Sequence, residues 1–134
     1  MHKFTLTRAI ADGATANRDR WQSDVENEIA DNGLLATAQS DINYVYGMTE
    51  QIERMHQDIR DNEIADILEL WRNEAGLLKA IGNDLNENVA LPQSSHTEGR
   101  LLALGWTLKK LVMSKSLTDK QRYQIQQTID DLNL

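Results

Sequence analysis

Hydrophobic residues recur every three or four positions along most of this 134-residue chain, which is the spacing of one face of an α-helix. The first stripe predicts a helix over residues 8–31, with Thr7 as its N-cap and Asn32-Gly33 as a left-handed stop. Its apolar positions are Ile10, Ala14, Trp21, Val25 and Ile29. The chain has one proline, Pro92, and its β-branched residues are too scattered for strands. The pattern therefore predicts an all-α fold.

A second stripe predicts a helix over residues 34–60. Its positions alternate three and four apart, which is a period near 3.5 and typical of coiled-coil-like packing against a neighbouring helix. The members of this stripe are Leu35, Ala38, Ile42, Val45, Thr49, Ile52, His56 and Ile59.

A third stripe begins after Ile59 and points about a third of a turn away from the second. We therefore predict a turn at residues 60–62, with Asp61 or Asn62 capping a third helix that reaches residue 85. One bent helix is the alternative. The members of the third stripe are Ile64, Ile67, Leu68, Trp71, Ala75, Leu78, Ile81 and Leu85.

The C-terminal third contains two matches to the capping box, the motif in which a hydroxyl residue and an acid or amide three positions later close a helix N-terminus. After a loop predicted at residues 86–94, Ser95 and Glu98 form the first match and open a helix over residues 96–114. Thr118 and Gln121 form the second and open a last helix, whose stripe is Tyr123, Ile125, Ile129 and Leu132. The expected fold is a single-domain helical bundle of about five helices over residues 1–134, with long central helices and a C-terminal helical hairpin.

The amino-acid composition restricts the possible site chemistry and the compartment of the protein. Hydrophobic residues make up 40% of the chain, enough for a core, and no cysteine is present. The absence of cysteine excludes disulfides, thiolate zinc sites and thiol nucleophiles, and it fits a reducing compartment. The longest apolar run, residues 101–108, is far shorter than the roughly 20 residues that span a bilayer. Since the N-terminus also lacks a signal-peptide pattern, we expect a cytoplasmic protein with no membrane partner.

The net charge of −7 is unevenly distributed. Residues 23–98 contain 16 acids and four bases, whereas residues 99–129 contain six bases and one acid. Such asymmetry can steer partners or favour head-to-tail self-association, and an ordinary solvated surface is the alternative. Nucleic-acid binding through the bases of residues 100–122 is a weaker hypothesis, because the chain is net negative and has few aromatic residues there.

Two acid-rich patterns are candidates for metal chemistry. Glu53 and His56 have the Glu-x-x-His spacing of di-iron bundles, but the second copy that such a site needs is missing. Glu50-x-x-Glu53 followed by Glu63-x-x-Asp66 resembles the paired acids of the MazG-type all-α nucleoside triphosphate pyrophosphohydrolases. The resemblance covers residues 50–85. It implies that carboxylates from two facing helices hold Mg²⁺ on the substrate phosphates.

The chain departs from that family in three respects. The segment between the acid pairs is short, and residues 87–96 have no match to the family's basic and asparagine phosphate contacts. In addition, Glu50 and Glu53 lie more than a quarter turn from the apolar stripe of their own helix. If this stripe faces the next helix, the four acids cannot converge. We therefore expect no cofactor, and the magnesium-dependent hydrolase is the alternative function.

The fourth predicted helix is apolar on two sides. One stripe consists of Leu101, Leu104, Leu108, Leu111 and Val112, and the opposite stripe of Leu102, Trp106 and Met113 is flanked by Lys109, Lys110 and Lys115. Such a helix either lies at the centre of a bundle or binds a partner. The preferred hypothesis is a non-enzymatic protein-binding module, an acidic adaptor, inhibitor or regulator. Its predicted contacts with another protein or a second copy are Leu102, Trp106, Lys109, Lys110 and Met113.

Overall fold

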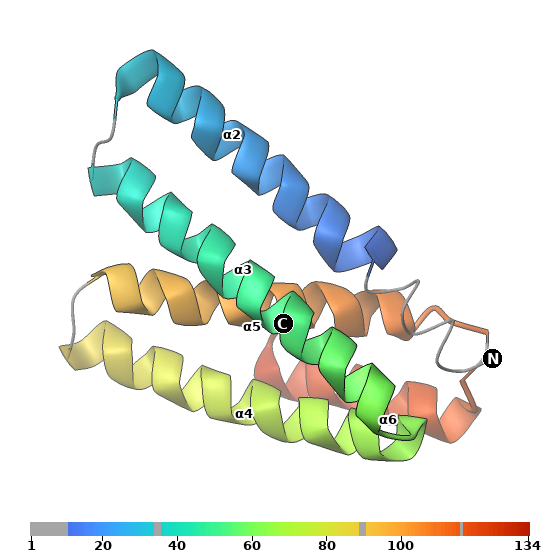
Figure 1. Ribbon diagram of the computed structural model, residues 1–134. Helices are drawn as coiled ribbons and strands as arrows, with labels where there is room; N and C mark the ends of the chain where they lie inside the picture. Colours follow the sequence, from blue (N-terminus) through green and yellow to red (C-terminus); the bar gives the residue numbers. More distant parts are fainter. Residues whose placement is uncertain (1–10, 34–35, 89–90, 116) are drawn as a thin grey trace.

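The computed structural model describes residues 11–33, 36–88, 91–115 and 117–134, and these residues form helices and turns without strands. A short π-helical turn, η1, leads into five α-helices (Figure 1). The all-α prediction is confirmed, and so is the expectation of about five helices. The elements are η1 (Ala11–Thr15), α2 (Ala16–Asn32), α3 (Ala36–Asp61), α4 (Ile64–Asn88), α5 (Leu91–Leu111) and α6 (Asp119–Leu132).

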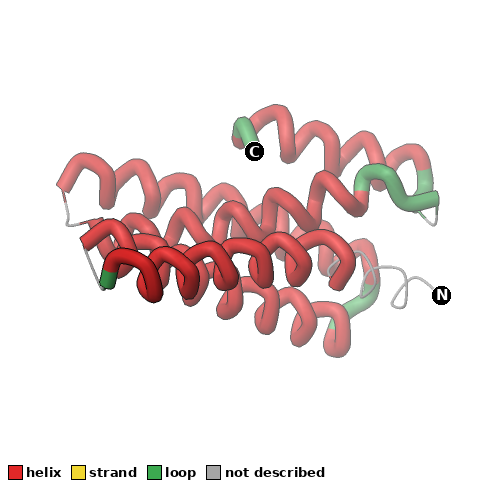
Figure 2. The backbone as a smooth tube through the Cα atoms, turned by 90° about the horizontal axis from the view of Figure 1, so that it is seen from above, coloured by secondary structure: helices red, strands yellow, loops and turns green. Residues whose placement is uncertain are grey.

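Helix α5 lies at the centre of the bundle and packs against α3, α4, α6 and η1. The helix α2 lies outside, against α3, where the rings of Trp21 and Tyr44 have centroids 5.6 Å apart. Seen from above, the helices run lengthwise along the molecule (Figure 2). The core joins fully buried side chains from the central helices, chiefly Met48, Met55, Ile67, Trp71, Leu104, Leu108 and Leu111.

The closest helix contact is between α3 and α5. A Cβ atom on Gly47 would overlap the carbonyl oxygen of His96, and one on Gly99 would overlap that of Tyr44. One turn before Gly99, the hydroxyls of Ser95 and Ser40 are 2.6 Å apart across the same contact. The two backbones therefore approach so closely that only glycine fits at both positions.

This contact explains an error in the prediction. Ser95 was expected to cap a helix after a loop at residues 86–94, but α4 continues to Asn88 and α5 begins at Leu91. Pro92 does not force a loop, because the first turn of a helix needs no donor from its backbone nitrogens. Ser95 lies inside α5, where its hydroxyl bonds across to α3.

The turn between α3 and α4 is confirmed, since α3 ends at Asp61 and α4 begins at Ile64. The predicted cap is wrong. The Asn62 side chain donates back to the Asp58 carbonyl oxygen, and the Asp61 carboxylate accepts a hydrogen bond from Gln57. Both side chains therefore bond within the end of α3.

Other helix ends are placed well by local signals. Gly33 ends α2 where predicted and has a positive φ of 77°, but its ψ of −178° is not that of the left-handed conformation expected there; its N–H bonds to the Ile29 carbonyl oxygen at 2.9 Å. The capping box of α6 is confirmed: the Thr118 hydroxyl accepts from the Gln121 N–H, and the Gln121 side chain accepts from the Thr118 N–H. The predicted cap Thr7 and the stripe positions Ile10 and Leu35 lie outside the described residues.

The orientation of two stripes needs correction. In α3, Met48 and Met55 are fully buried, whereas the predicted Thr49 and His56 are only half-buried. Ile52 and Ile59 of the predicted stripe are buried as expected, so the buried face is turned toward α5 by less than the 100° that separates neighbouring residues. In α6, the predicted Tyr123 is exposed and Thr128 is buried instead. Among the described residues, no helix combines the length and the apolar character needed to cross a membrane.

Candidate functional site

A groove lies between α3 and α4, on the face shown in Figure 1. The two helices meet at their short turn, diverge from it, and both rest on α5. The groove has a volume of about 640 Å³. Its walls are Arg54, Gln57 and Asp58 from α3 and Leu70, Asn73, Glu74, Leu77, Leu78 and Ile81 from α4, and Arg100 reaches it from α5.

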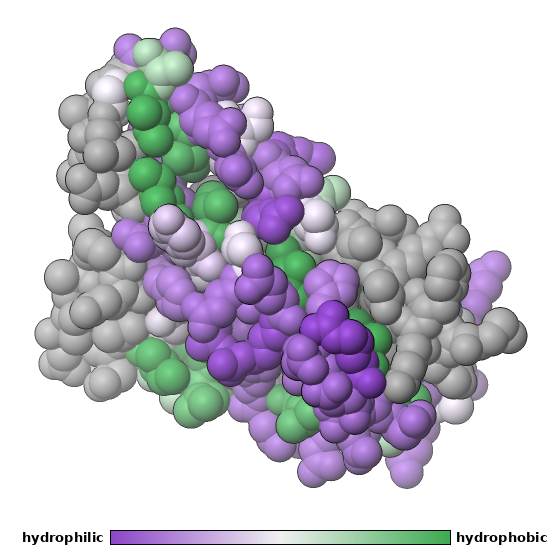
Figure 3. Space-filling view, viewed as in Figure 1, coloured by the Kyte–Doolittle hydropathy of each residue, from purple (hydrophilic) through white to green (hydrophobic). Residues whose placement is uncertain are grey.

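Three apolar side chains line one side of this groove and remain open to solvent. Leu70, Leu77 and Ile81 have exposed fractions of 42%, 61% and 39%. Their spacing of seven and four places them on one face of α4. The space-filling view shows apolar surface over this part of α4, and a second apolar band between α2 and α3 (Figure 3). We call these three residues the α4 strip.

The sequence contained a signal for this strip. The predicted core stripe of α4 included Ile81, which is in fact partly exposed, and it omitted Leu70 and Leu77. These two leucines belong to a second apolar series on the same helix. Helix α4 therefore has the same two-sided apolar character as α5, and the predicted core stripe did not include this face.

A charged network ties the floor of the groove together. Glu74 accepts from Arg54 at 3.2 Å and from Arg100 at 2.8 Å, and Arg100 also donates to the Gln51 side-chain oxygen at 3.1 Å. The side chains of Glu74 and Arg100 are both largely buried. Removing Glu74 would leave the buried Arg100 charge without a carboxylate partner, whereas removing Arg100 would leave Glu74 with Arg54 alone. The network thus holds α3, α4 and α5 at a fixed separation.

Two ionisable groups beside the groove have shifted pKa values. Burial raises the pKa of Asp58, and the hydrogen bond from the Trp71 indole, 2.9 Å long, partly offsets this effect. Burial lowers the pKa of His56, and the charge of nearby Arg60 lowers it further. These shifts favour a neutral His56 at neutral pH, and they mean that the charged form of Asp58 costs desolvation free energy in the folded protein.

One end of the groove is acidic. A smaller hollow of about 260 Å³ shares Leu70 and Asn73 with the groove and adds Asn62, Asp66 and Glu69. Within the described part of the chain, Asp66 and Glu69 form no ion pair, whereas the Arg54 and Arg100 charges meet at Glu74. The groove is therefore apolar over the α4 strip and carries free negative charge towards the start of α4.

The four candidate metal-binding acids are not brought together. The ion pair between Arg54 and Glu74 places these two residues at the same height on the antiparallel helices α3 and α4. From the rise of about 1.5 Å per residue, Asp66 then lies about 13 Å further along the axis than Glu53. Glu50 instead bonds to the His96 ring at 2.8 Å, and Glu53 and Glu63 are exposed. In residues 11–33, 36–88, 91–115 and 117–134, no three His, Asp or Glu side chains are placed to share a metal ion. The two-residue turn is the reason, because it places the acid pairs at different heights.

The predicted contacts on α5 are partly covered by the chain itself. Leu102 and Trp106 are half-buried against the core. The η1 turn lies over this side of α5, with Gly13 close to Lys110, and the C-terminal Leu134 lies against Gly105.

The remaining members of the set point to solvent. Lys109 and Lys110 are exposed, and Met113 lies beyond the end of α5 with 78% of its surface exposed. Leu102, Trp106 and Lys109 line one small pocket of about 110 Å³ that Lys110 and Met113 do not border, and partner binding through the five residues stays a prediction.

No protein-family model, curated protein or solved structure matches this chain.

Proposed function

We propose that this protein is a non-enzymatic binding module whose partner inserts an amphipathic α-helix into the groove between α3 and α4. The observation that carries the proposal is the α4 strip, in which Leu70, Leu77 and Ile81 are exposed along one wall of a groove. Exposed apolar residues grouped in this way are typical of interaction sites. The adaptor, inhibitor or regulator role expected from the sequence would act through this surface.

The shape of the groove favours a helix as the occupant. Two helices that diverge over a common third helix leave room for one more rod of the same diameter. From Leu70 to Ile81 the strip is about 16 Å long, which corresponds to three turns of a helix. A partner helix with apolar residues at positions i, i+4 and i+7 would therefore contact all three side chains.

The charges favour a partner helix that is basic at one end. Asp66 and Glu69 carry free negative charge next to Leu70, so a lysine or arginine one turn beyond the apolar positions would lie close to them. The excess of acids over residues 23–98 would also speed the approach of a basic partner. A second copy of this chain, through its basic residues 99–129, is the competing occupant and is an outcome of the test below.

A photo-crosslinking experiment tests the proposal. The photoreactive residue p-benzoylphenylalanine is placed at position 77 and, as a matched control, at position 123, where Tyr123 has a similar exposed fraction on α6. After illumination in host cells, mass spectrometry identifies the crosslinked segment. We expect position 77 to capture an amphipathic helix with a basic end from another protein, and position 123 not to capture it.

Three outcomes would overturn the proposal. The first is equal capture of the same proteins from positions 77 and 123. The second is a crosslink from position 77 only to another copy of this chain, which would make the groove a self-association surface. The third is capture of a segment that, as an isolated peptide, does not gain helical circular dichroism on binding.

A further inference from the structure

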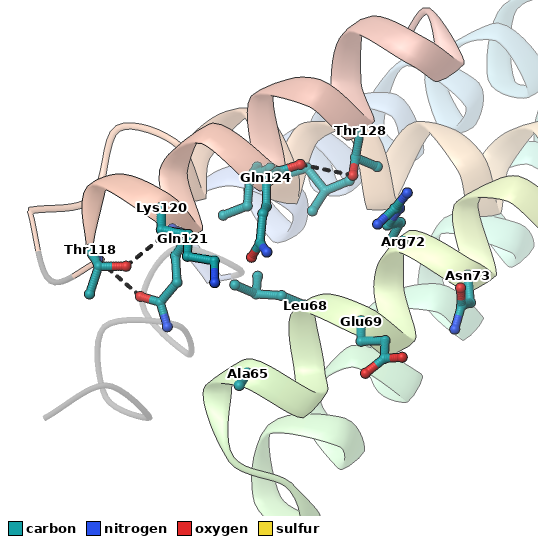
Figure 4. Close-up of a pocket in the computed structure, with 12 residues that line it drawn as sticks. Ala65, Leu68, Glu69, Arg72, Asn73, Thr118, Lys120, Gln121, Gln124 and Thr128 are labelled. Atoms are coloured by element: carbon teal, nitrogen blue, oxygen red, sulfur yellow. Dashed lines mark hydrogen bonds between the residues drawn. The ribbon is translucent and has the colours of Figure 1, made fainter.

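A second cavity lies between α4 and α6, over α5, and has a volume of about 440 Å³ (Figure 4). This size falls within the range of about 300–1,000 Å³ that is usual for small-molecule sites. The residues that line it are Ala65, Leu68, Glu69, Arg72 and Asn73 from α4, Leu108 from α5, and Thr118, Lys120, Gln121, Gln124, Ile125 and Thr128 from the α6 region.

The floor of the cavity is apolar and its rim is polar. Leu68, Leu108 and Ile125 are buried core residues that also border the cavity, so each exposes only a small part of its surface there. The amide side chain of Gln124 and the ammonium of Lys120 reach down from α6 toward Leu68 (Figure 4). A ligand in this cavity would therefore meet an apolar surface below and polar groups around its edge.

Two positive charges at the rim have no partner among the described residues. Arg72, on α4, extends toward α6, and Lys120 lies in the first turn of α6 (Figure 4). Neither forms a salt bridge or a side-chain hydrogen bond with any residue that the structure describes. By contrast, Arg54, Arg100 and Arg122 each bind a carboxylate.

The only acid in the lining does not neutralise these charges. The Glu69 carboxylate points away from α6, on the far side of Leu68 from Lys120 (Figure 4). The N-terminal end of α6, with its partial positive charge, adds to the positive potential at this rim. Arg72 lies beside Thr128 and Lys120 lies about two turns earlier on α6, so the two charges are at opposite ends of the cavity and both favour an anion in the space between them (Figure 4).

We propose that this cavity binds a small amphipathic anion. The apolar body of the ligand lies on Leu68, Leu108 and Ile125. Its carboxylate or phosphate lies near Gln124, where the long side chains of Arg72 and Lys120 can reach it from the two ends of the cavity. The side-chain amide of Gln124 is placed to donate a further hydrogen bond to the same head group. The site is separate from the groove between α3 and α4, so it does not rest on the function proposed above.

Four naphthalene and phosphate probes test the proposal by isothermal titration calorimetry on the whole chain. The probes are 1-naphthoate, 1-naphthyl phosphate, the neutral 1-naphthamide and inorganic phosphate. We expect saturable one-to-one binding of at least one of the two naphthalene anions. The neutral probe and inorganic phosphate should each bind about tenfold more weakly, because the first lacks the negative charge and the second lacks the apolar body. Whichever naphthalene anion binds more tightly identifies the preferred head group.

Substitutions at the rim test whether the naphthalene anions bind in this cavity. Arg72→Gln and Lys120→Gln should each weaken anion binding about tenfold and leave naphthamide binding unchanged. Lys109→Gln, an exposed lysine of α5 outside the cavity, is the matched control and should have no effect. Ala65→Phe should narrow the cavity and reduce the affinity for both naphthalene anions. Since all four positions are exposed, circular dichroism should show an unchanged fold.

The proposal is overturned if neither naphthalene anion binds saturably at millimolar concentration. It is also overturned if the anions bind equally well to the wild type and to the double variant Arg72→Gln/Lys120→Gln. Amide chemical-shift changes confined to residues outside 65–73 and 118–128 would show binding elsewhere and would likewise reject it.

Discussion

Helices α4 and α5 each have two apolar sides, but they differ in how much of the second side is covered by the rest of the chain. The second side of α5 is partly covered by η1 and by the C-terminal Leu134, because α5 lies at the centre. The second side of α4 faces the groove, and Leu77 there remains 61% exposed. A helix with two apolar sides is thus not by itself a sign of a binding surface. Its position in the bundle decides whether the second side is core or available to a partner.

The glycines of the two helices offer the sharpest test of this difference. In Gly99→Ala, the new Cβ would overlap the Tyr44 backbone, so α3 and α5 would have to separate and stability should fall by about 3 kcal/mol. In Gly76→Ala, on α4, the new Cβ meets nothing within 4 Å and stability should rise by about 1 kcal/mol. Urea unfolding measures both, and a similar change in the two variants would contradict the central position of α5.

Truncating one side chain on the second apolar side of each helix to alanine tests the same difference between α5 and α4. Trp106→Ala should lower the free energy of unfolding by about 2 kcal/mol or more, less than for a fully buried tryptophan, because Trp106 is half-buried against the core. Leu77→Ala should change it by no more than about 0.5 kcal/mol, as expected for an exposed position. Thermal unfolding of the isolated protein separates the two. A stable Trp106→Ala variant beside an unstable Leu77→Ala variant would reverse the assignment of core and open surface.

The smallest expected effect concerns the pH dependence of Asp58 at the edge of the groove. Its pKa in the folded protein is raised above the ordinary value of 3.8. Its contribution to stability is therefore fully present below pH 3.8 and is lost as the pH rises through the folded pKa. Asp58→Asn keeps an acceptor for the Trp71 indole but carries no charge, so it should melt slightly higher than the wild type at pH 7. This advantage should shrink as the pH falls toward 3.8. A difference that stays constant between pH 3.5 and 7 would show that the charge of Asp58 does not matter.

Features set by a few neighbouring residues could be predicted from the sequence. The Thr118–Gln121 capping box and the stop at Gly33 depend on hydrogen bonds within one turn, and the turn after Asp61 follows from a change of apolar face along one stretch of chain. Features that depend on a distant helix could not. Ser95 matches a capping box, yet its hydroxyl bonds to Ser40, 55 residues away.

The candidate site was harder to predict than the fold for the same reason. The burial of Met55 in preference to His56 depends on which side α5 approaches α3. The exposure of Leu77 depends on how far α3 and α4 diverge over α5, and neither distance nor direction is encoded by periodicity within one helix. The sequence did predict that Glu50 and Glu53 point away from the apolar stripe of their own helix, but the height difference between Glu53 and Asp66 follows from the length of the turn.

The most direct test of the central claim is the affinity of the helix captured at position 77. The crosslinked segment is made as a synthetic peptide and titrated against the wild type, Leu77→Asp on the α4 strip, and Lys110→Glu on the predicted α5 surface. We expect Leu77→Asp to weaken binding at least tenfold, since it places a charge in an apolar contact, and Lys110→Glu to leave the affinity unchanged. Loss of binding in Lys110→Glu with full affinity in Leu77→Asp would contradict binding in the groove between α3 and α4 and would indicate a binding site on α5.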